Sequence, residues 1–253
     1  MRMNVQGIYD IINQIAPLEL AEDWDNVGIL AGSACQEVER VLCALELNPA
    51  VIEEAKQKDV QLIVTHHPIL FRGRKNLRED DPEGKMLCEL IRSKIALIAA
   101  HTNFDNADPG VNNVLAAMLG LEQIESCECG LRAGVPKQAT LGAFCDYAQT
   151  VLGGPIRCYG ERDRKIHRVA VIGGAGGDFA ALCKKVNADV FLTGEISHHR
   201  AWDAYLSGVC ALEAGHAATE MPAISMLADG LQKAADSVQC KLRVFVSEVD
   251  LFK

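Results

Sequence analysis

Histidine and carboxylate side chains recur at the ends of four apolar, strand-like runs of this 253-residue sequence, and six of the seven histidines lie there. The positions are His66 and His67 after Val60–Thr65, His101 and Asp105 after Ile95–Ala100, Glu195, His198 and His199 after Ala188–Thr193, and His216 and Glu220 after Val209–Gly215. Imidazole and carboxylate are ligands of divalent ions such as Zn, Mn, Fe, Co and Ni. The pattern predicts a metal site; the alternative is a set of ordinary polar side chains without a metal.

The adjacent pair His66 and His67 suits two metal ions better than one. Consecutive side chains of an extended backbone diverge, so two neighbours can bind different ions a few ångströms apart. The ten cysteines include no Cys-x-x-Cys pair, and none ends a strand as these histidines do. This favours an open, water-bearing site over a closed structural zinc site.

The elements that would position these residues occur twice. A strand-like run, a helical pattern and a second strand-like run occupy Arg40–Leu45, Pro49–Lys58 and Val60–Thr65, and the order returns at Arg168–Ile172, Asp178–Val186 and Ala188–Thr193. Short apolar runs separated by helical patterns favour parallel strands buried on both faces. We predict two βαβ units related by duplication; the alternative is chance likeness between apolar strands.

The predicted fold class is therefore α/β, with two duplicated three-layer α/β domains, mostly parallel sheets and the metal site at their interface. Residues 1–125 with 222–253 form the first predicted domain, and residues 126–221 form the second. The last strand, Leu242–Val246, is expected to return to the first sheet. Ligands of parallel α/β sheets gather at the carboxyl ends of strands, which is where the histidines lie.

The glycine-rich run Gly173–Gly177 follows a predicted strand and precedes Asp178, a good helix N-cap residue. It does not match the dinucleotide pattern Gly-x-Gly-x-x-Gly, because Phe179 stands at the third glycine position. A tight turn is the favoured interpretation. A phosphate site that uses the backbone N–H groups of Gly174 and Gly176 is the alternative.

Four basic residues follow His66 and His67 closely in the chain: Arg72, Arg74, Lys75 and Arg78. They suit the rim of a pocket for an anionic, phosphorylated substrate, with Arg72 and Lys75 as candidate binding residues, although solvated surface charge explains them equally well. Asp23, Asp25 and Asn26 either line the same mouth or, as we favour, form a turn that leads into a strand.

Composition limits the class of partner. The chain has 49% hydrophobic and 23% charged residues and a net charge of −9, which opposes binding driven by nucleic-acid phosphates. The best apolar stretch, 95–100, is far too short to span a bilayer, and the N-terminus has no secretory pattern. We expect a cytoplasmic globular protein whose cysteines are mostly small buried hydrophobes, with no membrane partner and no nucleic-acid partner.

The motifs together resemble the GTP cyclohydrolase 1 type 2 family, also called the NIF-three-like or YbgI family. The resemblance rests on Asp25-Asn-Val-Gly28, Thr65-His-His-Pro68, His101-Thr-Asn-Phe-Asp105, Gly110-Val-Asn112, Gly173-Gly-Ala-Gly176, Thr193-Gly-Glu195 and His216-Ala-Ala-Thr-Glu220, in that order. It extends from about Trp24 to the C-terminus, in the short form without an inserted domain.

The resemblance implies a dinuclear metal centre between two α/β domains and a ring-shaped homohexamer, a trimer of dimers, with the metal sites facing the interior. The residues that match the family's metal ligands are His66, His67, Asp105, His216 and Glu220, and Glu220 would bridge both ions. His101 matches a position near the centre, outside the direct ligands or facing the substrate.

Two hypotheses of different classes follow. In the first, the protein is a metal-dependent hydrolase in which two divalent ions lower the pKa of a shared water, Glu195, His198 or His101 moves protons, and the substrate is a purine nucleotide or another small anion. In the second, it is a metal-binding ring or adaptor protein that engages a protein partner, and its ions are structural. Removal of the metal would dissolve the second assembly but leave the first intact.

Overall fold

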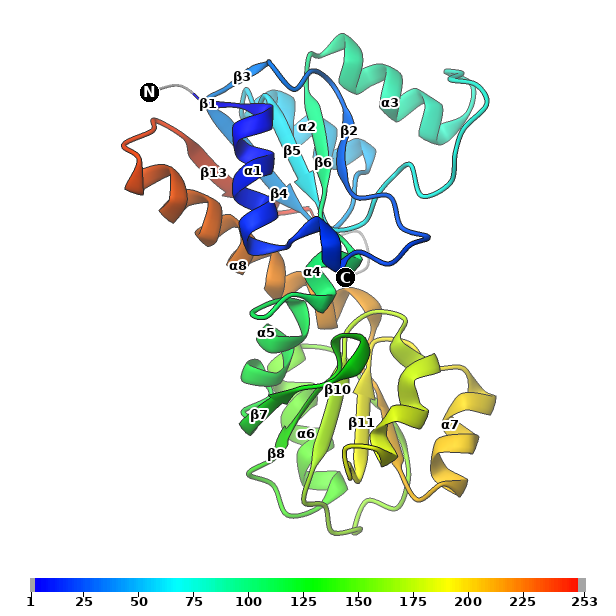
Figure 1. Cartoon of the computed structure of the whole chain (residues 1–253). Helices are drawn as coiled ribbons and strands as arrows, with labels where there is room; N and C mark the ends of the chain where they lie inside the picture. Colours follow the sequence, from blue (N-terminus) through cyan, green and yellow to red (C-terminus); the bar gives the residue numbers. More distant parts are fainter. Residues whose placement is uncertain (1–2, 250–253) are drawn as a thin grey trace. The chain divides into compact units, whose positions relative to one another are not determined.

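The strand-like runs of the sequence form the centres of two β-sheets in a computed structural model of the chain, which describes residues 3–249 (Figure 1). The chain divides into two compact units, residues 1–104 with 224–253 and residues 105–223. The divisions fall within helices α4 (Thr102–Asn106) and α8 (His216–Ser237), so each of these helices begins in one unit and ends in the other.

The first unit contains a five-stranded sheet. Its strand order is β13 (Arg243–Val246), β4 (Arg40–Ala44), β5 (Leu62–Thr65), β6 (Ala96–Ala99) and β2 (Gly28–Ala31). The first four are parallel, and β2 pairs with β6 in the antiparallel sense. A small antiparallel pair, β1 (Met3–Asn4) and β3 (Glu37–Val38), and the short 3-10 helix η1 (Leu18–Leu20) complete the strand-and-turn elements before α2.

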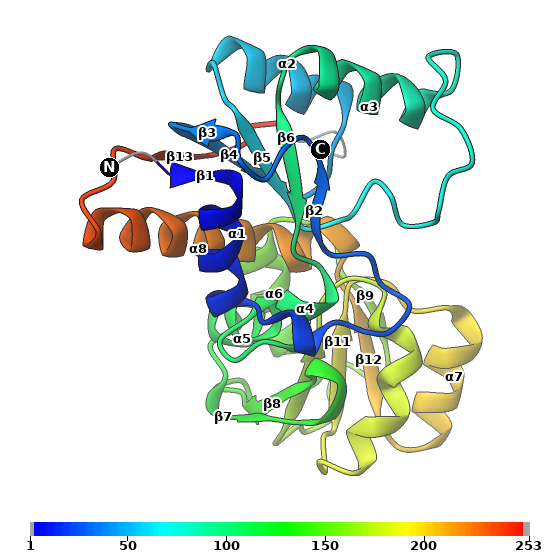
Figure 2. The same ribbon diagram turned by 45° about the horizontal axis from the view of Figure 1, so that its top comes forward.

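Helices cover both faces of this sheet. Helices α2 (Pro49–Gln57) and α3 (Pro82–Arg92) lie on one face, and α1 (Val5–Ile15) and the part of α8 in this unit lie on the other (Figure 2). The side chains of Asn48 and Asp81 accept hydrogen bonds from the first turns of α2 and α3, and each is followed by a proline at the first helical position, which explains where these helices begin. Every residue of β5 and β6 is buried as a result.

The second unit contains a six-stranded sheet. Its order is β7 (Glu122–Ser126), β8 (Arg132–Val135), β10 (Val169–Ile172), β11 (Val190–Thr193), β12 (Cys210–Glu213) and β9 (Arg157–Tyr159). The central strands β10, β11 and β12 are parallel, and the outer strands join in the antiparallel sense. The helical elements are α5 (Val111–Met118), α6 (Leu141–Leu152), α7 (His198–Leu206), and the 3-10 helices η2 (Glu128–Gly130) and η3 (Gly176–Lys184).

Alternate residues of the central strands pack on opposite faces of the second sheet. Val169 and Val171 pack with α5 and α6, whereas Ala170 and Ile172 pack with η3 and α7. Burial of one such aliphatic side chain contributes about 1.5–3 kcal/mol. The central strands β10 and β11 therefore carry no charged side chain.

The fold-class prediction is confirmed in its main feature, because parallel strands with helices on both faces occupy the centres of both sheets. The strand predicted at Leu242–Val246 is present as β13 and pairs with β4 of the first sheet. The duplication and the domain limits 1–125 with 222–253 and 126–221 stay predictions, and residues 1–2 and 250–253 of the first predicted domain lie outside the described residues.

One local prediction is correct in position but wrong in helix type and in the N-cap residue. The segment expected to be a helix from Asp178 to Val186 is the 3-10 helix η3, which begins at Gly176. Asp178 does not cap it, because Ala175 is at the N-cap position and Asp178 lies inside the first turn. The Asp178 carboxylate pairs with Arg200 of α7 at 2.7 Å. At the start of η3, Gly177 N–H donates to the carbonyl of Glu195.

Among residues 3–249, no helix has both the length and the apolar composition needed to cross a membrane.

Candidate metal centre

His66 and His67 lie in the turn that follows β5, and backbone hydrogen bonds hold this turn in place. His66 N–H donates to the carbonyl of Ala44 at 3.2 Å, and His67 N–H donates to that of Leu45 at 2.8 Å. The Thr65 hydroxyl donates to the carbonyl of His67 at 2.9 Å. The turn therefore presents both imidazoles at the carboxyl end of the first sheet, with His66 fully buried and His67 half-buried.

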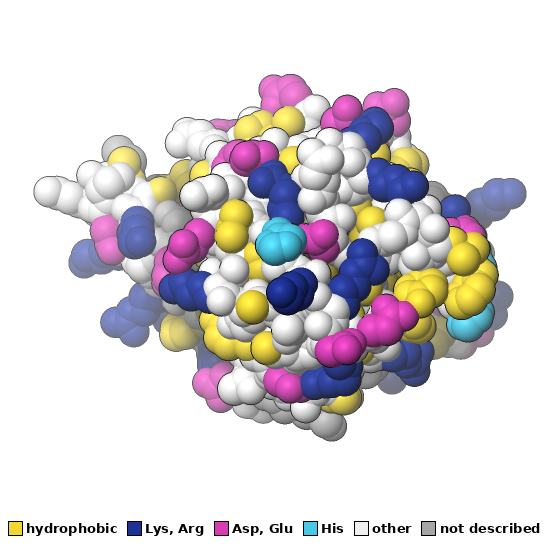
Figure 3. Space-filling view, turned by 90° about the horizontal axis from the view of Figure 1, so that it is seen from below, with side chains coloured by type: hydrophobic (Ala, Val, Ile, Leu, Met, Phe, Trp, Pro, Cys, Tyr) yellow, Lys and Arg dark blue, Asp and Glu magenta, His cyan; other side chains and the backbone are white. Residues whose placement is uncertain are grey.

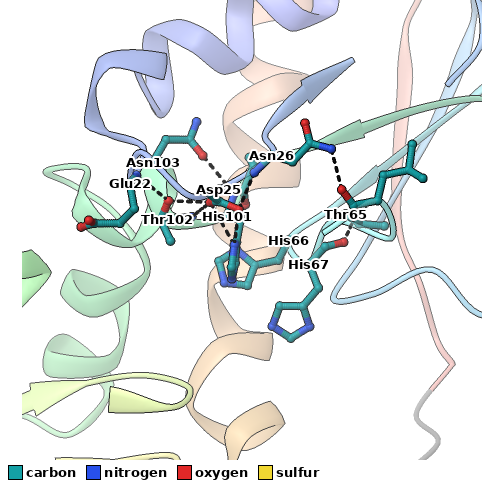
Figure 4. Close-up of polar contacts among 11 residues, drawn as sticks. Glu22, Asp25, Asn26, Thr65, His66, His67, His101, Thr102 and Asn103 are labelled. Atoms are coloured by element: carbon teal, nitrogen blue, oxygen red, sulfur yellow. Dashed lines mark hydrogen bonds and ion pairs between the residues drawn. The ribbon is translucent and has the colours of Figure 1, made fainter. Parts of the chain in front are cut away.

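Three imidazoles of the first unit form a candidate metal-binding group. One ring nitrogen from each of His66, His67 and His101 lies within 4.8 Å of the other two (Figure 4). His66 Nδ1 lies 2.8 Å from the carbonyl of Ala100, which accepts its proton. In a neutral imidazole this leaves the lone pair on Nε2, the arrangement that metal-binding histidines commonly use.

The third imidazole is oriented by Asp25. His101 Nδ1 lies 3.0 Å from both carboxylate oxygens of Asp25, and Thr102 donates to the same carboxylate from its backbone N–H at 3.0 Å and its hydroxyl at 2.5 Å. Burial by itself raises the pKa of Asp25, but the hydrogen bonds from His101 and Thr102 outweigh it and hold that pKa well below its ordinary value. Asp25 is thus a fixed negative charge that keeps the proton of His101 on Nδ1 and its lone pair on Nε2.

A second donor group lies in the other unit, where α8 begins. His216 Nε2 lies 3.1 Å from a carboxylate oxygen of Glu220, one helical turn further on, and Nδ1 lies 2.9 Å from Glu195. The hydrogen bond to Glu220, opposed by burial and aided by Glu195, raises the pKa of His216 to about 9. A cation that replaced the proton between His216 and Glu220 would find two donors already adjacent, with Glu195 as the outer partner of the imidazole.

The glycine-rich loop packs directly against this second group. Gly174 has a φ of +60°, and a Cβ at this position would lie 2.1 Å from Glu220 Oε1 and 3.2 Å from His216 Nε2. Gly174 N–H donates to the Thr219 hydroxyl at 3.0 Å, and that hydroxyl donates to the carbonyl of His216 at 2.8 Å. The missing side chain of Gly174 therefore makes room for the Glu220 carboxylate.

The other predicted loop residues lie in different settings. Gly176 N–H donates to the Thr193 hydroxyl at 3.1 Å, and a Cβ there would lie 2.6 Å from Ile172, which favours the tight-turn interpretation. His198 is the exposed first residue of α7, and within residues 3–249 no hydrogen bond or ion pair joins it to His216 or Glu220. Asp105 lies in α4, where its carbonyl accepts a hydrogen bond from Asn112 at 3.2 Å.

The basic residues after His67 divide into two pairs. Arg74 forms ion pairs with Asp81 and Glu83, and Arg78 forms one with Asp80. Arg72 and Lys75 are exposed, and no ion pair joins either of them to a carboxylate of the described part of the chain. Only Arg72 and Lys75 therefore keep charge that a substrate could use.

Several residues around the donors were not singled out from the sequence. Thr102 binds Asp25, Thr219 connects the glycine-rich loop to α8, and Gly194 approaches Gly174 so closely that a Cβ would lie 2.6 Å from the Gly174 carbonyl. Their sequence signal is their place inside the family motifs, where each stands next to a predicted site residue. Asp25 was assigned to a turn, and its contact with His101, 76 residues away, depends on the fold.

Comparison with known proteins agrees with this α/β architecture. The family model described as Duf34/NIF3 (NGG1p interacting factor 3) matches residues 3–251. The chain belongs to this family, which confirms the resemblance inferred from the motifs.

Individual relatives match over nearly the whole chain. A protein of Clostridium acetobutylicum named GTP cyclohydrolase 1 type 2 homolog is 30% identical over 100% of this chain and 99% of its own length. The crystal structure of Staphylococcus aureus hypothetical protein SA1388 is 28% identical, covers 100% of this chain and 99% of that chain, and superposes with a TM-score of 0.93. A Bacillus cereus protein related to NIF3, at 22% identity, 99% and 98% coverage and a TM-score of 0.94, shows the same fold.

Replacement of Asp25 tests the first donor group. The Asp25→Ala substitution leaves the hydrogen-bond donors of His101 and Thr102 without their acceptor, and we expect it to lower the free energy of unfolding by about 3 kcal/mol. Asp23→Ala, at an exposed carboxylate two residues away, should change it by less than about 0.5 kcal/mol. Urea denaturation of the metal-free protein measures both values, and equal effects would contradict the role of Asp25.

Replacement of Gly174 tests the second. Gly174→Ala and Gly153→Ala both place a side chain at positive φ, +60° and +75°, but only the first meets Glu220, since a Cβ at Gly153 meets nothing within 4 Å. Gly153→Ala should cost about 1 kcal/mol of stability, and Gly174→Ala should cost more, because its Cβ must also displace the Glu220 carboxylate. We expect only Gly174→Ala to weaken metal binding, by roughly 10–100-fold. Calorimetric titration with Zn²⁺ and Mn²⁺ compares the two, and unchanged affinity in Gly174→Ala would count against the packing argument.

The raised pKa of His216 predicts how the stability of the metal-free protein depends on pH. Because the folded-state pKa is about 9 and the unfolded value about 6.5, the stabilisation from protonated His216 is fully present below pH 6.5 and is lost as the pH rises through 9. Denaturation measured at intervals across this range should show the loss in the native chain and not in His216→Gln. His199→Gln, at an exposed histidine that contacts Ser197, serves as the control and should keep the native profile.

Proposed function

We propose that this chain is a metal-dependent hydrolase that binds two divalent cations and acts on a nucleotide or a similar phosphorylated small molecule. The observation that carries the proposal is the placement of two proposed ligands, His66 and His67, beside His101. One ring nitrogen of each lies within 4.8 Å of the other two, and Ala100 and Asp25 accept the outer protons of His66 and His101. The name GTP cyclohydrolase 1 type 2 homolog, carried by relatives, supports a nucleotide substrate.

The proposed metal ligands are His66, His67, Asp105, His216 and Glu220. The donor set fits Zn, Mn, Fe, Co or Ni, since it is made of imidazole and carboxylate. When bound, such cations polarise the bond to be hydrolysed and activate water. Assembly into a homohexamer, supported by the family resemblance, belongs to the same proposal.

The residues around the ligands have distinct proposed roles. Glu195 holds the Nδ1 proton of His216 and thereby orients the imidazole, a positioning role that fits its 2.9 Å contact better than proton transfer to a substrate does. His101, held by Asp25, takes the acid or base role, because it lies beside the proposed ligands His66 and His67 without being one of them. Arg72 and Lys75 provide the positive charge for an anionic substrate.

Charge on the surface offers little support for nucleic acid as the partner. On the face drawn in Figure 3, lysine and arginine side chains are interspersed with aspartate and glutamate side chains. A surface that binds a nucleic-acid backbone carries lysine and arginine side chains clustered in one patch. A small anionic substrate is the better match to the local pair Arg72 and Lys75.

Metal content and turnover test the proposal together. Elemental analysis of the purified protein should find about two divalent ions per chain, and fewer in His66→Gln, His67→Gln, His216→Gln and Glu220→Gln, with His199→Gln as the matched control. Metal-loaded protein should hydrolyse at least one member of a nucleotide and phosphoester panel, and Glu220→Gln should not.

Chelation distinguishes this function from that of a structural metal-binding adaptor. In a hydrolase, removal of the metal abolishes turnover and leaves the mass in solution unchanged. A protein that binds metal, turns over nothing on the panel and dissociates on chelation would contradict the proposal and support the adaptor.

A further inference from the structure

Two large aromatic side chains stand exposed beside the three-histidine group. Trp24 is 57% exposed and Phe71 is 46% exposed. Their ring centroids lie 5.5 Å apart, and the centroids of Trp24 and Phe71 lie 6.2 Å and 6.3 Å from that of His101. Such exposure leaves apolar ring surface in water directly next to candidate metal ligands.

Polar contacts, rather than core packing, hold this aromatic pair in place. The Asn26 side-chain amide donates to the carbonyl of Leu70 at 2.6 Å, so it joins the loop that carries Trp24 to the loop that carries Phe71. Asp25, next to Trp24, is anchored through His101 and Thr102. These bonds hold the two loops that carry the rings next to His101.

The geometry of the pair suits a third ring. The planes of Trp24 and Phe71 are inclined by 56°, so a planar group that stacks parallel to one ring would be inclined to the other by the same angle. Offset stacking and edge contacts are the favoured arrangements of aromatic systems. Stacking on protein aromatic side chains is also how unpaired nucleobases are commonly bound.

Positive charge lies next to the pair in the chain. Arg72 follows Phe71, is exposed, and forms no ion pair with a carboxylate of the described residues, whereas Arg74 and Arg78 are both neutralised by acidic neighbours. A guanidinium can bind a phosphate through two parallel hydrogen bonds. The surroundings therefore suit a ring that carries an anionic group.

We propose that Trp24 and Phe71 form a binding site for the planar heteroaromatic ring of a phosphorylated small molecule, with Arg72 contacting its anionic group. This inference rests on the proposed function, because it states which part of the proposed substrate binds beside the metal ligands. Trp24 and Phe71 bind and orient the ring and take no part in bond breaking.

The test measures the binding of four probes, GMP, AMP, CMP and UMP, with ribose 5-phosphate as the probe that lacks the ring. The chain has two tryptophans, so Trp202→Phe leaves Trp24 as the single tryptophan and also removes the other exposed one. We expect at least one nucleotide, but not ribose 5-phosphate, to quench the fluorescence of Trp24 in this variant. By calorimetry, Trp24→Leu and Phe71→Leu should each weaken nucleotide binding about tenfold or more, and Trp202→Phe should not.

The site would be overturned if none of the four nucleotides bound the native protein, or if Trp24→Leu bound nucleotides with the affinity of the native chain. It would also be overturned if Trp24→Leu lost as much affinity for ribose 5-phosphate as for the nucleotides. A change of mass in solution on Trp24→Leu would show that another copy of the chain covers the pair, and would also overturn it. Metal content measured on the same samples separates the two proposals. Nucleotide binding that depends on the ring, in protein that binds no metal, would support the aromatic site and refute the hydrolase. Metal binding and turnover that are unchanged in Trp24→Leu would support the hydrolase and refute the aromatic site.

Discussion

Burial of parallel strands on both faces is the constraint on which the rest of this structure depends. Every residue of β5, β6, β10 and β11 is buried, so these strands offer no position where a charged side chain could remain solvated. Polar chemistry is displaced to the loops beyond their carboxyl ends. His66 and His67 follow β5 and Glu195 follows β11 in such loops, because the strands before them are filled with aliphatic side chains.

A second layer of hydrogen bonds turns these loops into defined donor groups. Ala100 accepts from His66, Asp25 from His101, and Glu195 contacts the outer nitrogen of His216. For His66 and His101 the contact sets which ring nitrogen carries the proton in the neutral imidazole, and the opposite nitrogen is then the one able to bind a cation. His216 must first lose the proton that it shares with Glu220. The two units use the same device with different partners, a backbone carbonyl and a buried aspartate in the first and a glutamate in the second.

Backbone shape matters as much as charge in the second unit. Gly174 and Gly194 approach each other and α8 so closely that side chains at either position would collide with Glu220, Thr219 or the Gly174 carbonyl. The glycine-rich run resembles a phosphate-binding loop in composition, yet in this structure Gly174 leaves room for the Glu220 carboxylate. Loop composition alone did not separate these two uses, because both require glycine for close approach.

The sequence by itself determined the α/β class, the strands that precede the histidines, the return of β13 to the first sheet and the family, because apolar periodicity and local motifs are written in consecutive residues. The tertiary structure alone decided that Asp25 meets His101, that Glu195 meets His216, and that Trp24 meets Phe71. These pairs are 76, 21 and 47 residues apart in the chain (101 − 25, 216 − 195 and 71 − 24). A hydrogen bond or a ring contact acts over only a few ångströms, so the path of the chain between the partners must be known before the contact can be inferred.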